Sequence, residues 1–200
     1  METVLILDFG AQYSQLIARR VREQNVYCEV KPCSISPDEI RELAPIGIIL
    51  SGGPQSVYES VSLHVDPALF SLGIPVLGIC YGCQLMAYSL GGTVAAATEA
   101  TAREYGKTLT EFDTQSAIFH GLPASSVTWM SHGDYISQVP DGFTVTAKTA
   151  VCPTAAMACP EKKLYGVQFH PEVQHTVQGS EILRRFLYSV CGASGDWTMA

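Results

Sequence analysis

The sequence predicts an α/β domain built on a doubly wound, mainly parallel sheet to which antiparallel strands are added. Two observations carry this prediction. In the first half of the 200-residue chain, short apolar runs alternate with amphipathic segments, as strands and helices do in βαβ units. In the second half, short β-like pieces are separated by turn signals. The length suits one globular domain, or at most two small ones, and is enough to bury a full core.

The apolar runs of the first half are expected to be buried parallel strands over residues 4–7, 26–30, 46–50 and 75–79. Helices are expected between and after them, around 16–22, over 37–43, near 67–72 and over 84–90. Ser36-Pro37 gives the second helix a serine cap and a proline at its first position. Gly91-Gly92 ends the last of these helices. The first half should therefore form the doubly wound layer.

The β-like pieces of the second half lie near residues 92–97, 104–110, 125–130, 143–149 and 164–169. They are expected to add antiparallel strands to the same domain. A final helix is expected from about 179 to 190, because Ile182, Leu183, Phe186 and Leu187 fall on one face. The predicted domain therefore spans 1–190. Residues 191–200, with Trp197, form a tail or the start of a linker.

Composition excludes several classes of function. A formal net charge of −7 argues against nucleic acid or an anionic membrane as the main partner. No apolar run approaches the length of a spanning helix, and no signal peptide is apparent. The seven cysteines are odd in number and do not have the usual zinc spacings. We therefore expect a cytoplasmic domain with reduced thiols, no bound metal, and no nucleic-acid or membrane partner.

The strongest local signal is Gly78-Ile79-Cys80-Tyr81-Gly82, which has the spacing of a nucleophile elbow with cysteine in place of serine. A tight turn from strand to helix would expose the sulfur near a helix N-terminus, where the thiolate is favoured. A buried structural cysteine is the plain alternative. Cys80 and Cys83 also form a CxxC pair, which leaves redox chemistry as a weaker alternative.

A thiol nucleophile needs a base, and the base needs a group that orients it. The segment around His170-Pro171-Glu172 reads as an extended strand, in which residues i and i+2 project to the same side. His170 and Glu172 are therefore expected to lie side by side. A solvated or structural histidine is the alternative, and it suits the other histidines better.

Ser51-Gly52-Gly53-Pro54 ends the predicted third strand and is a candidate oxyanion-binding turn. Two glycines would allow backbone N–H groups to point at an anion, although an ordinary βα turn explains the motif equally well. Neither a Walker motif nor GxGxxG occurs in the chain.

Cys80, His170 and Glu172, together with these motifs, resemble the class I glutamine amidotransferases over essentially the whole chain. That family has a flavodoxin-like fold. The motifs are closer still to its GMP synthetase branch, through LILDFG at 5–10, GIILSGGP at 47–54, WMSHGD at 129–134 and GVQFHPE at 166–172.

The resemblance implies catalytic Cys80, His170 and Glu172, with the backbone N–H groups of Gly53 and Tyr81 as the oxyanion hole. It implies a glutamine pocket lined by Gly52, Gln84, Ser131, His132 and Gly133, and it places Asp134 toward a partner. The partner would be an ATP pyrophosphatase domain that uses Mg and ATP to aminate XMP with the released ammonia. No cofactor is implied for the present domain.

Two alternatives stay open, namely another Cys-dependent γ-glutamyl hydrolase and a non-catalytic regulatory module on the same fold. Cys83 departs from the family pattern, which usually has another side chain there. The Ala- and Thr-rich stretch over 93–102 has no functional account.

Overall fold

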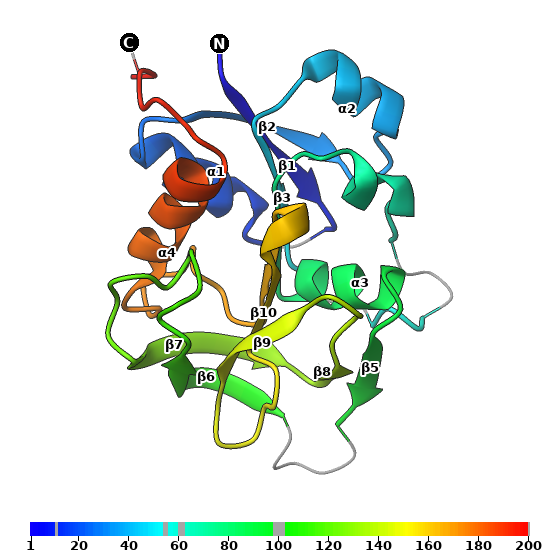
Figure 1. The fold of residues 1–200 in the computed structure, drawn as a ribbon, viewed down its shortest axis with the longest axis vertical. Helices are drawn as coiled ribbons and strands as arrows, with labels where there is room; N and C mark the ends of the chain where they lie inside the picture. The colour runs from blue at the N-terminus through cyan, green and yellow to red at the C-terminus, as the bar shows by residue number, and fades with distance from the viewer. Residues whose placement is uncertain (11, 54–55, 60–62, 98–102, 200) are drawn as a thin grey trace.

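The computed structural model describes residues 1–10, 12–53, 56–59, 63–97 and 103–199. In this part of the chain, the central sheet has nine strands in the order β2-β1-β3-β4-β11-β10-β9-β6-β7 (Figure 1). Its strands are β1 (Thr3–Asp8), β2 (Tyr27–Pro32), β3 (Gly47–Leu50), β4 (Val76–Ile79), β6 (Glu104–Phe112), β7 (Ser125–His132), β9 (Thr144–Lys148), β10 (Ala156–Cys159) and β11 (Leu164–Val167). A separate ribbon pairs β5 (Thr93–Ala96) with β8 (Asp134–Gln138).

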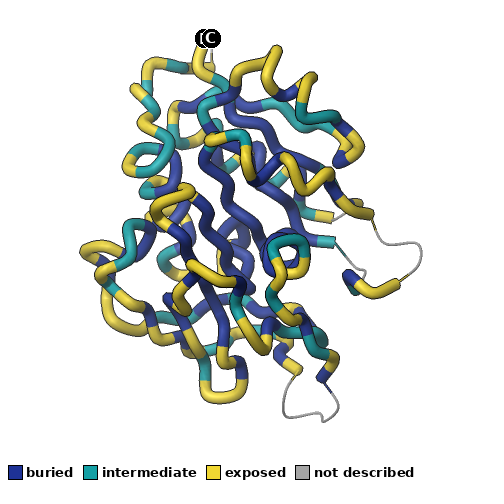
Figure 2. Tube along the Cα trace, turned by 45° about the vertical axis from the view of Figure 1, so that its right-hand side comes forward, coloured by how far each residue is buried: buried dark blue, intermediate teal, exposed yellow. Residues whose placement is uncertain are grey.

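The parallel half of the sheet has the strand order β2-β1-β3-β4-β11, which is the flavodoxin-like order. Each neighbouring pair in this half is parallel. Every residue of β3, β4 and β11 is buried, as expected for strands covered on both faces. Figure 2 shows this buried centre surrounded by exposed helix faces and loops.

Helices cover both faces of the sheet and divide the core in two. One cluster packs α1 (Ser14–Glu23) and α4 (Gly179–Arg185), with the π-helical turn η4 (Phe186–Val190), against residues such as Ile6 and Val167. The other packs α2 (Pro37–Leu43), the 3₁₀ turn η1 (Pro67–Ser71) and α3 (Tyr81–Ser89) against residues such as Leu7 and Leu50. The layers are visible on the two sides of Figure 1. The predicted doubly wound, mainly parallel architecture with added antiparallel strands is confirmed.

Several elements differ from the prediction. The piece near 164–169 pairs in parallel with β4, instead of adding an antiparallel strand. It ends at Val167, so His170 lies beyond the strand. β8 and β10 were not predicted, because they lack long apolar alternation. The piece near 92–97 belongs to the small ribbon, not to the central sheet.

The helices differ from the prediction at their ends. α3 begins at Tyr81, three residues before the expected start at Gln84. The last helix widens into η4 after Arg185, so the α-helix does not run on to 190. The short turn η3 (Pro160–Lys162), which joins β10 to β11, was not predicted. Residues 98–102 and Pro54, which belong to segments singled out in the sequence, lie outside the described residues.

The C-terminal tail packs back on the domain. The ring of Trp197 lies 5.8 Å from that of Tyr27, and Asn25 Nδ2 donates to the Trp197 carbonyl at 3.2 Å. Ser194 donates from its backbone N and from Oγ to the Glu2 carboxylate, at 2.9 Å in both cases. These contacts hold both chain ends at the same side of the molecule (Figure 1).

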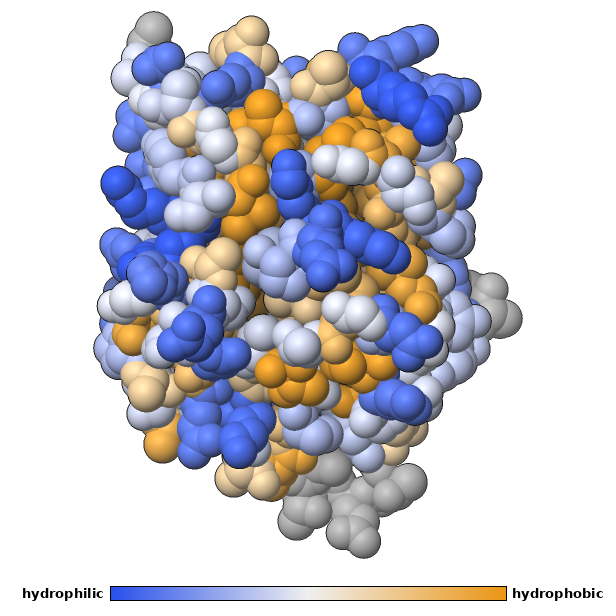
Figure 3. Space-filling view, in the orientation of Figure 1, coloured by the Kyte–Doolittle hydropathy of each residue, from blue (hydrophilic) through white to orange (hydrophobic). Residues whose placement is uncertain are grey.

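The surface mixes hydrophilic and hydrophobic residues over the face seen in Figure 3. Among the described helices, none is both long enough and apolar enough to cross a bilayer.

Candidate active site

Cys80 lies at a strained turn between β4 and α3. Its backbone has φ 52° and ψ −109°, a conformation that side-chain-bearing residues rarely adopt. The flanking glycines allow the turn, because a Cβ at Gly78 would lie 2.6 Å from the Gly82 carbonyl oxygen. A Cβ at Gly82 would lie 2.5 Å from the carbonyl oxygen of Leu50. The geometry is that of the predicted nucleophile elbow, and strain of this kind is typical of functional sites.

His170 and Glu172 form a buried pair beside this turn. His170 Nδ1 and Glu172 Oε1 are 2.7 Å apart, and the two side chains are 7% and 0% exposed. Thr176 Oγ1 donates to the His170 carbonyl at 2.6 Å, and the His170 N–H donates to the Trp129 carbonyl at 3.0 Å. The pair was predicted from an extended strand, but it forms in the turn that follows β11. These hydrogen bonds to Trp129 and from Thr176, rather than strand alternation, set its geometry.

Electrostatics favour a charged imidazole at His170. Burial acts to lower the pKa of His170, but its interactions with the Cys80 thiol and the Glu172 carboxylate outweigh this and raise the pKa to about 11. Glu172 is thus placed to hold the ring by Nδ1 and to stabilise its positive charge.

The loop after β3 lies against His170 and Cys80. A Cβ at Gly52 would lie 3.1 Å from His170 Cε1 and 3.6 Å from Cys80 Cβ. The glycine therefore leaves room for the side chains of His170 and Cys80 to lie against the loop backbone. Ser51 Oγ accepts from the Phe9 N–H at 3.1 Å and donates to the Gly52 carbonyl at 3.1 Å, which fixes the loop from within.

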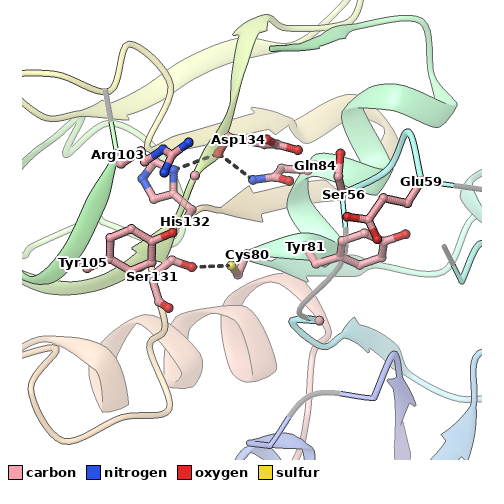
Figure 4. A pocket seen from close by; sticks show the side chains of 12 residues that line it. Ser56, Glu59, Cys80, Tyr81, Gln84, Arg103, Tyr105, Ser131, His132 and Asp134 are labelled. Atoms are coloured by element: carbon pink, nitrogen blue, oxygen red, sulfur yellow. Dashed lines mark hydrogen bonds between the residues drawn. The ribbon is translucent and has the colours of Figure 1, made fainter. Parts of the chain in front are cut away.

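A cavity of about 420 Å³ opens at Cys80 (Figure 4). It lies at the carboxyl ends of the parallel strands, where ligands bind in this class of sheet. The structure brings most predicted residues to its wall, namely Gly53, Cys80, Tyr81, Gln84, Ser131, His132, Gly133 and Asp134. Gly52, His170 and Glu172 are not among the residues that line this cavity.

Two predicted pocket residues have internal roles as well. Gln84 Nε2 donates to the Asp134 carbonyl and to Gln168 Oε1, both at 3.0 Å, which uses both of its N–H groups. The Ser131 carbonyl accepts from Cys80 Sγ at 3.6 Å. Figure 4 shows the contacts of Cys80 with Ser131 and of Gln84 with Asp134 as dashed lines.

Sequence reasoning missed several residues of the site. Gln168 is fully buried, and its Nε2 donates to Cys80 Sγ at 3.6 Å. Its position two residues before His170 was an available signal. Arg20 Nε donates to the Glu172 carbonyl at 2.9 Å. The cavity wall also includes four side chains that no motif indicated, namely Ser56, Glu59, Arg103 and Tyr105.

Cys83 faces the core. It is fully buried, and a Cβ at Gly166 would lie 2.6 Å from its sulfur, so its small side chain fills the contact between α3 and β11. Burial raises the pKa of the Cys83 thiol well above its usual value. A buried thiol with so little thiolate character does not suit a redox pair with Cys80.

One group of potential metal ligands occurs in the described part of the chain. The donor atoms of Glu104, His132 and Cys152 lie within 4.8 Å of one another. All three side chains make hydrogen bonds within the protein. Burial, and after it the nearby Glu104, raise the pKa of the Cys152 thiol to about 12, which disfavours the thiolate that a metal requires. We therefore interpret the group as a hydrogen-bond network.

Comparisons with known proteins agree with this geometry. A family model described as "Glutamine amidotransferase class-I" matches residues 5–190. The chain is 55% identical to "GMP synthase [glutamine-hydrolyzing]" of Clostridium botulinum (strain Alaska E43 / Type E3) and 57% identical to that of Caldanaerobacter subterraneus subsp. tengcongensis. In both cases, 99% of this chain matches 38% of the relative, so the chain spans about two fifths of those proteins.

Solved structures give the same relationship. A GMP-synthase-subunit-A-like protein from Thermoplasma acidophilum superposes with a TM-score of 0.85 at 32% identity, covering 96% of this chain and 94% of that one. A glutamine amidotransferase from Thermotoga maritima shares the fold, with a TM-score of 0.75 at 20% identity, covering 96% and 99%. The chain is a glutamine amidotransferase domain of the class I family, homologous to the glutaminase part of GMP synthase.

Proposed function

We propose that this domain hydrolyses glutamine to glutamate and ammonia through a thioester on Cys80, and that the ammonia aminates XMP to GMP in an ATP pyrophosphatase domain. The observation that carries the proposal is the strained Cys80 turn facing the buried His170–Glu172 pair, where the two side chains of the pair meet at 2.7 Å. A nucleophile, a base and a group that orients the base are the parts that acyl transfer by cysteine requires.

In the proposed reaction, the Cys80 thiolate attacks the side-chain amide carbon of glutamine. The backbone N–H groups of Gly53 and Tyr81 receive the developing oxyanion. His170 gives its proton to the departing nitrogen, which leaves as ammonia, and a γ-glutamyl thioester remains on Cys80. The now neutral His170 takes a proton from water, whose oxygen attacks the thioester, and glutamate is released with Cys80 restored as thiolate. Glu172 orients His170 throughout and stabilises the ring whenever it is protonated.

We assign substrate binding to Gly52 and to the Ser131-His132-Gly133 backbone, which forms one wall of the cavity. For Gln84 we propose a supporting role, because both of its N–H groups hold Asp134 and Gln168. Arg103 and Glu59 carry opposite charges in the cavity wall and suit the charged ends of a free amino acid.

The partner domain is proposed from chemistry and from the relatives' length. Ammonia becomes ammonium in neutral water and loses its nucleophilicity, so an adjoining, water-excluding acceptor site is needed. The matched GMP synthases are longer than this chain, which covers 38% of them. We propose that residues 1–190 form the glutaminase domain, that 191–200 lead toward the partner, and that Asp134 faces it. Mg and ATP would act only there. The seven free cysteines support a cytoplasmic location.

The test is peptide mass spectrometry after treatment with 6-diazo-5-oxo-norleucine, a reactive glutamine analogue. Label confined to Cys80 and suppressed by excess glutamine is the expected result, and Cys80→Ala should abolish both labelling and glutamate release. Cys83→Ala is the matched control, because this buried thiol lies three residues further on, in the first turn of α3, and its loss should leave labelling intact.

Two other functions predict different results. Faster turnover of γ-glutamyl peptides than of free glutamine would favour another Cys-dependent γ-glutamyl hydrolase. A folded protein whose Cys80 stays unlabelled, even with the partner domain added, would favour a regulatory module and overturn the proposal.

A further inference from the structure

A buried carboxylate lies next to the cavity without lining it. Glu104 is the first residue of β6, and its side chain is 5% exposed. Its Oε1 faces His132 Nε2 at 3.0 Å, and its Oε2 accepts from Thr149 Oγ1 at 2.8 Å. Thr149 Oγ1 in turn accepts from the Cys152 N–H at 2.9 Å. A buried carboxylate persists only when it is paired and hydrogen-bonded, and Glu104 is both.

His132 lies between two acceptors. Its Nδ1 faces the Asp134 carbonyl at 2.8 Å, and its Nε2 faces Glu104 Oε1. Because a carbonyl only accepts, Nδ1 carries a proton. A neutral imidazole would then point the Nε2 lone pair at a carboxylate oxygen, so a second proton must lie in that contact. With this proton on Nε2, the contact is a hydrogen-bonded pair of imidazolium and carboxylate, and each ring N–H has an acceptor. His132 thus acts as a donor in two directions.

The position of His132 makes this network relevant to the site. His132 ends β7, Asp134 begins β8, and the main chain between them forms part of the cavity wall. Ser131 on one side accepts from the Cys80 thiol, and the Asp134 carbonyl on the other accepts from Gln84. Figure 4 shows His132 joined to Asp134 and Asp134 to Gln84 in this corner. The imidazole therefore holds the turn formed by residues 131–134 in place from within the protein.

We propose that Glu104 is a positioning residue of the glutaminase site: it holds His132 as an imidazolium with two N–H donors, and so fixes the 131–134 corner against which glutamine binds. Glu104 does not contact the substrate and acts through His132. The inference deepens the proposed function and rests on it.

The first experiment measures the protonation of the His132 ring in the wild-type chain. Two-bond ¹H–¹⁵N correlation spectra of the wild-type chain at pH 7, with the ring of His132 assigned by loss of its signals in His132→Gln, report which ring nitrogens carry protons. Protons on both nitrogens are the expected result. A ring with a single protonated nitrogen would overturn the two-donor arrangement.

The second experiment compares Glu104→Ala, Glu104→Gln and the control Glu111→Ala. Glu104→Ala leaves Nε2 without its partner, and we expect kcat/KM for glutamine to fall roughly 10²-fold, mainly through KM, as a displaced substrate-binding wall would cause. Glu104→Gln can donate from its amide to a neutral His132 and accept from Thr149, so kcat/KM should stay within about fivefold of wild type. Glu111 is on the same strand, and its side chain is 65% exposed, so its variant should match wild type.

The fraction of the protein that the diazo analogue labels at saturation distinguishes a displaced binding wall from a loss of folded protein. A merely structural role would lower the labelled fraction and leave KM unchanged, and that result would overturn the inference. If Glu104→Ala does not fold, Thr149→Val removes one donor to Glu104, and an unchanged KM there would count against the inference. A folded wild-type chain that neither labels nor releases glutamate, even with the partner domain added, would refute the proposed function, while the ring spectra would still decide the state of His132.

Discussion

At the scale of single residues, the site depends on one imidazole held between a thiol and a carboxylate. Burial alone would keep His170 neutral, because a charged ring is poorly solvated in the interior. The interactions with Cys80 and Glu172 overcome that cost and raise the pKa of His170 from 6.5 to about 11. An imidazolium at neutral pH can provide the proton that the departing ammonia needs in the proposed reaction.

This shift predicts a dependence of stability on pH. Because the folded-state pKa lies above the unfolded value, the stabilisation is fully present below pH 6.5 and is lost as pH rises toward about 11. The free energy of unfolding of wild type minus that of His170→Gln, from urea titrations, should shrink between pH 7 and 10, by at most about 1.4 kcal/mol per pH unit. His120→Gln, at an exposed position, is the control. A difference that is constant or grows over this range would contradict the assignment.

The placement of residues could be predicted where they lie close together in one short motif. Gly78-x-Cys80-x-Gly82 requires a tight turn whatever surrounds it, and His170-Pro-Glu172 brings base and carboxylate together within three positions. Glu104 and His132 are 28 positions apart and meet because β6 pairs with β7 in a register that aligns them. A single sequence does not show that register, so a lone Glu in a β-like piece gave no signal. Alternation in an extended segment would also have placed Gln168 on the same side as His170, but Gln168 was not predicted as a site residue.

At the scale of elements, the β4–α3 turn depends on close backbone packing. In Gly82→Ala the new Cβ would meet the Leu50 backbone, which cannot move aside without disturbing β3. We expect a loss of about 1–3 kcal/mol in unfolding free energy, with slower labelling of Cys80, because overpacking shifts the backbone. Gly91→Ala is the matched control: it has φ +94° and no atom within 4 Å of an added Cβ. It should lose stability by strain alone and keep the labelling rate, and equal labelling of both variants would refute this account of the turn.

Element prediction worked best where both faces of a strand are buried. The apolar runs of β1, β3 and β4 stood out, and their parallel pairing followed from the intervening helices. β10 has the sequence AMAC, which is too short and too weakly β-forming to distinguish from a loop. β8 depends on its partner β5, which is remote in sequence. The parallel pairing of β11 with β4 depends on chain topology, because a local β-like pattern does not give strand direction.

At the scale of the whole molecule, the strand order places the candidate active-site residues at the carboxyl ends of neighbouring strands in the middle of the sheet. The ends of β3, β4 and β11 supply the Gly52 loop, Cys80 and His170, and the antiparallel extension supplies the opposite wall through Ser131 to Asp134. The parallel half therefore carries the proposed reacting groups, while the added strands shape the pocket. This division explains why a resemblance in motifs from both halves was needed to predict a glutamine site.

In the same arrangement, the backbone carbonyl and the side-chain carboxylate of Asp134 have separate roles. Its carbonyl accepts from Gln84 and His132, and these bonds survive any side-chain substitution. Its half-buried carboxylate makes no hydrogen bond among the described residues and lines the cavity, which suits a contact with the proposed partner. Asp134→Ala in the isolated chain should therefore keep kcat/KM for glutamine within about twofold of wild type.

In a protein of the relatives' full length, the same variant should release more glutamate than the acceptor consumes as ammonia, while amination supported by added ammonium stays at the wild-type rate. The ratio of glutamate formed to acceptor aminated is the quantity to measure, and wild type should give one to one. Loss of glutamine hydrolysis in the isolated chain would place the carboxylate in the glutamine pocket instead. An unchanged ratio in the long protein would remove Asp134 from the interface. A raised ratio would show that the carboxylate couples the two reactions, since the glutaminase chemistry itself would be intact.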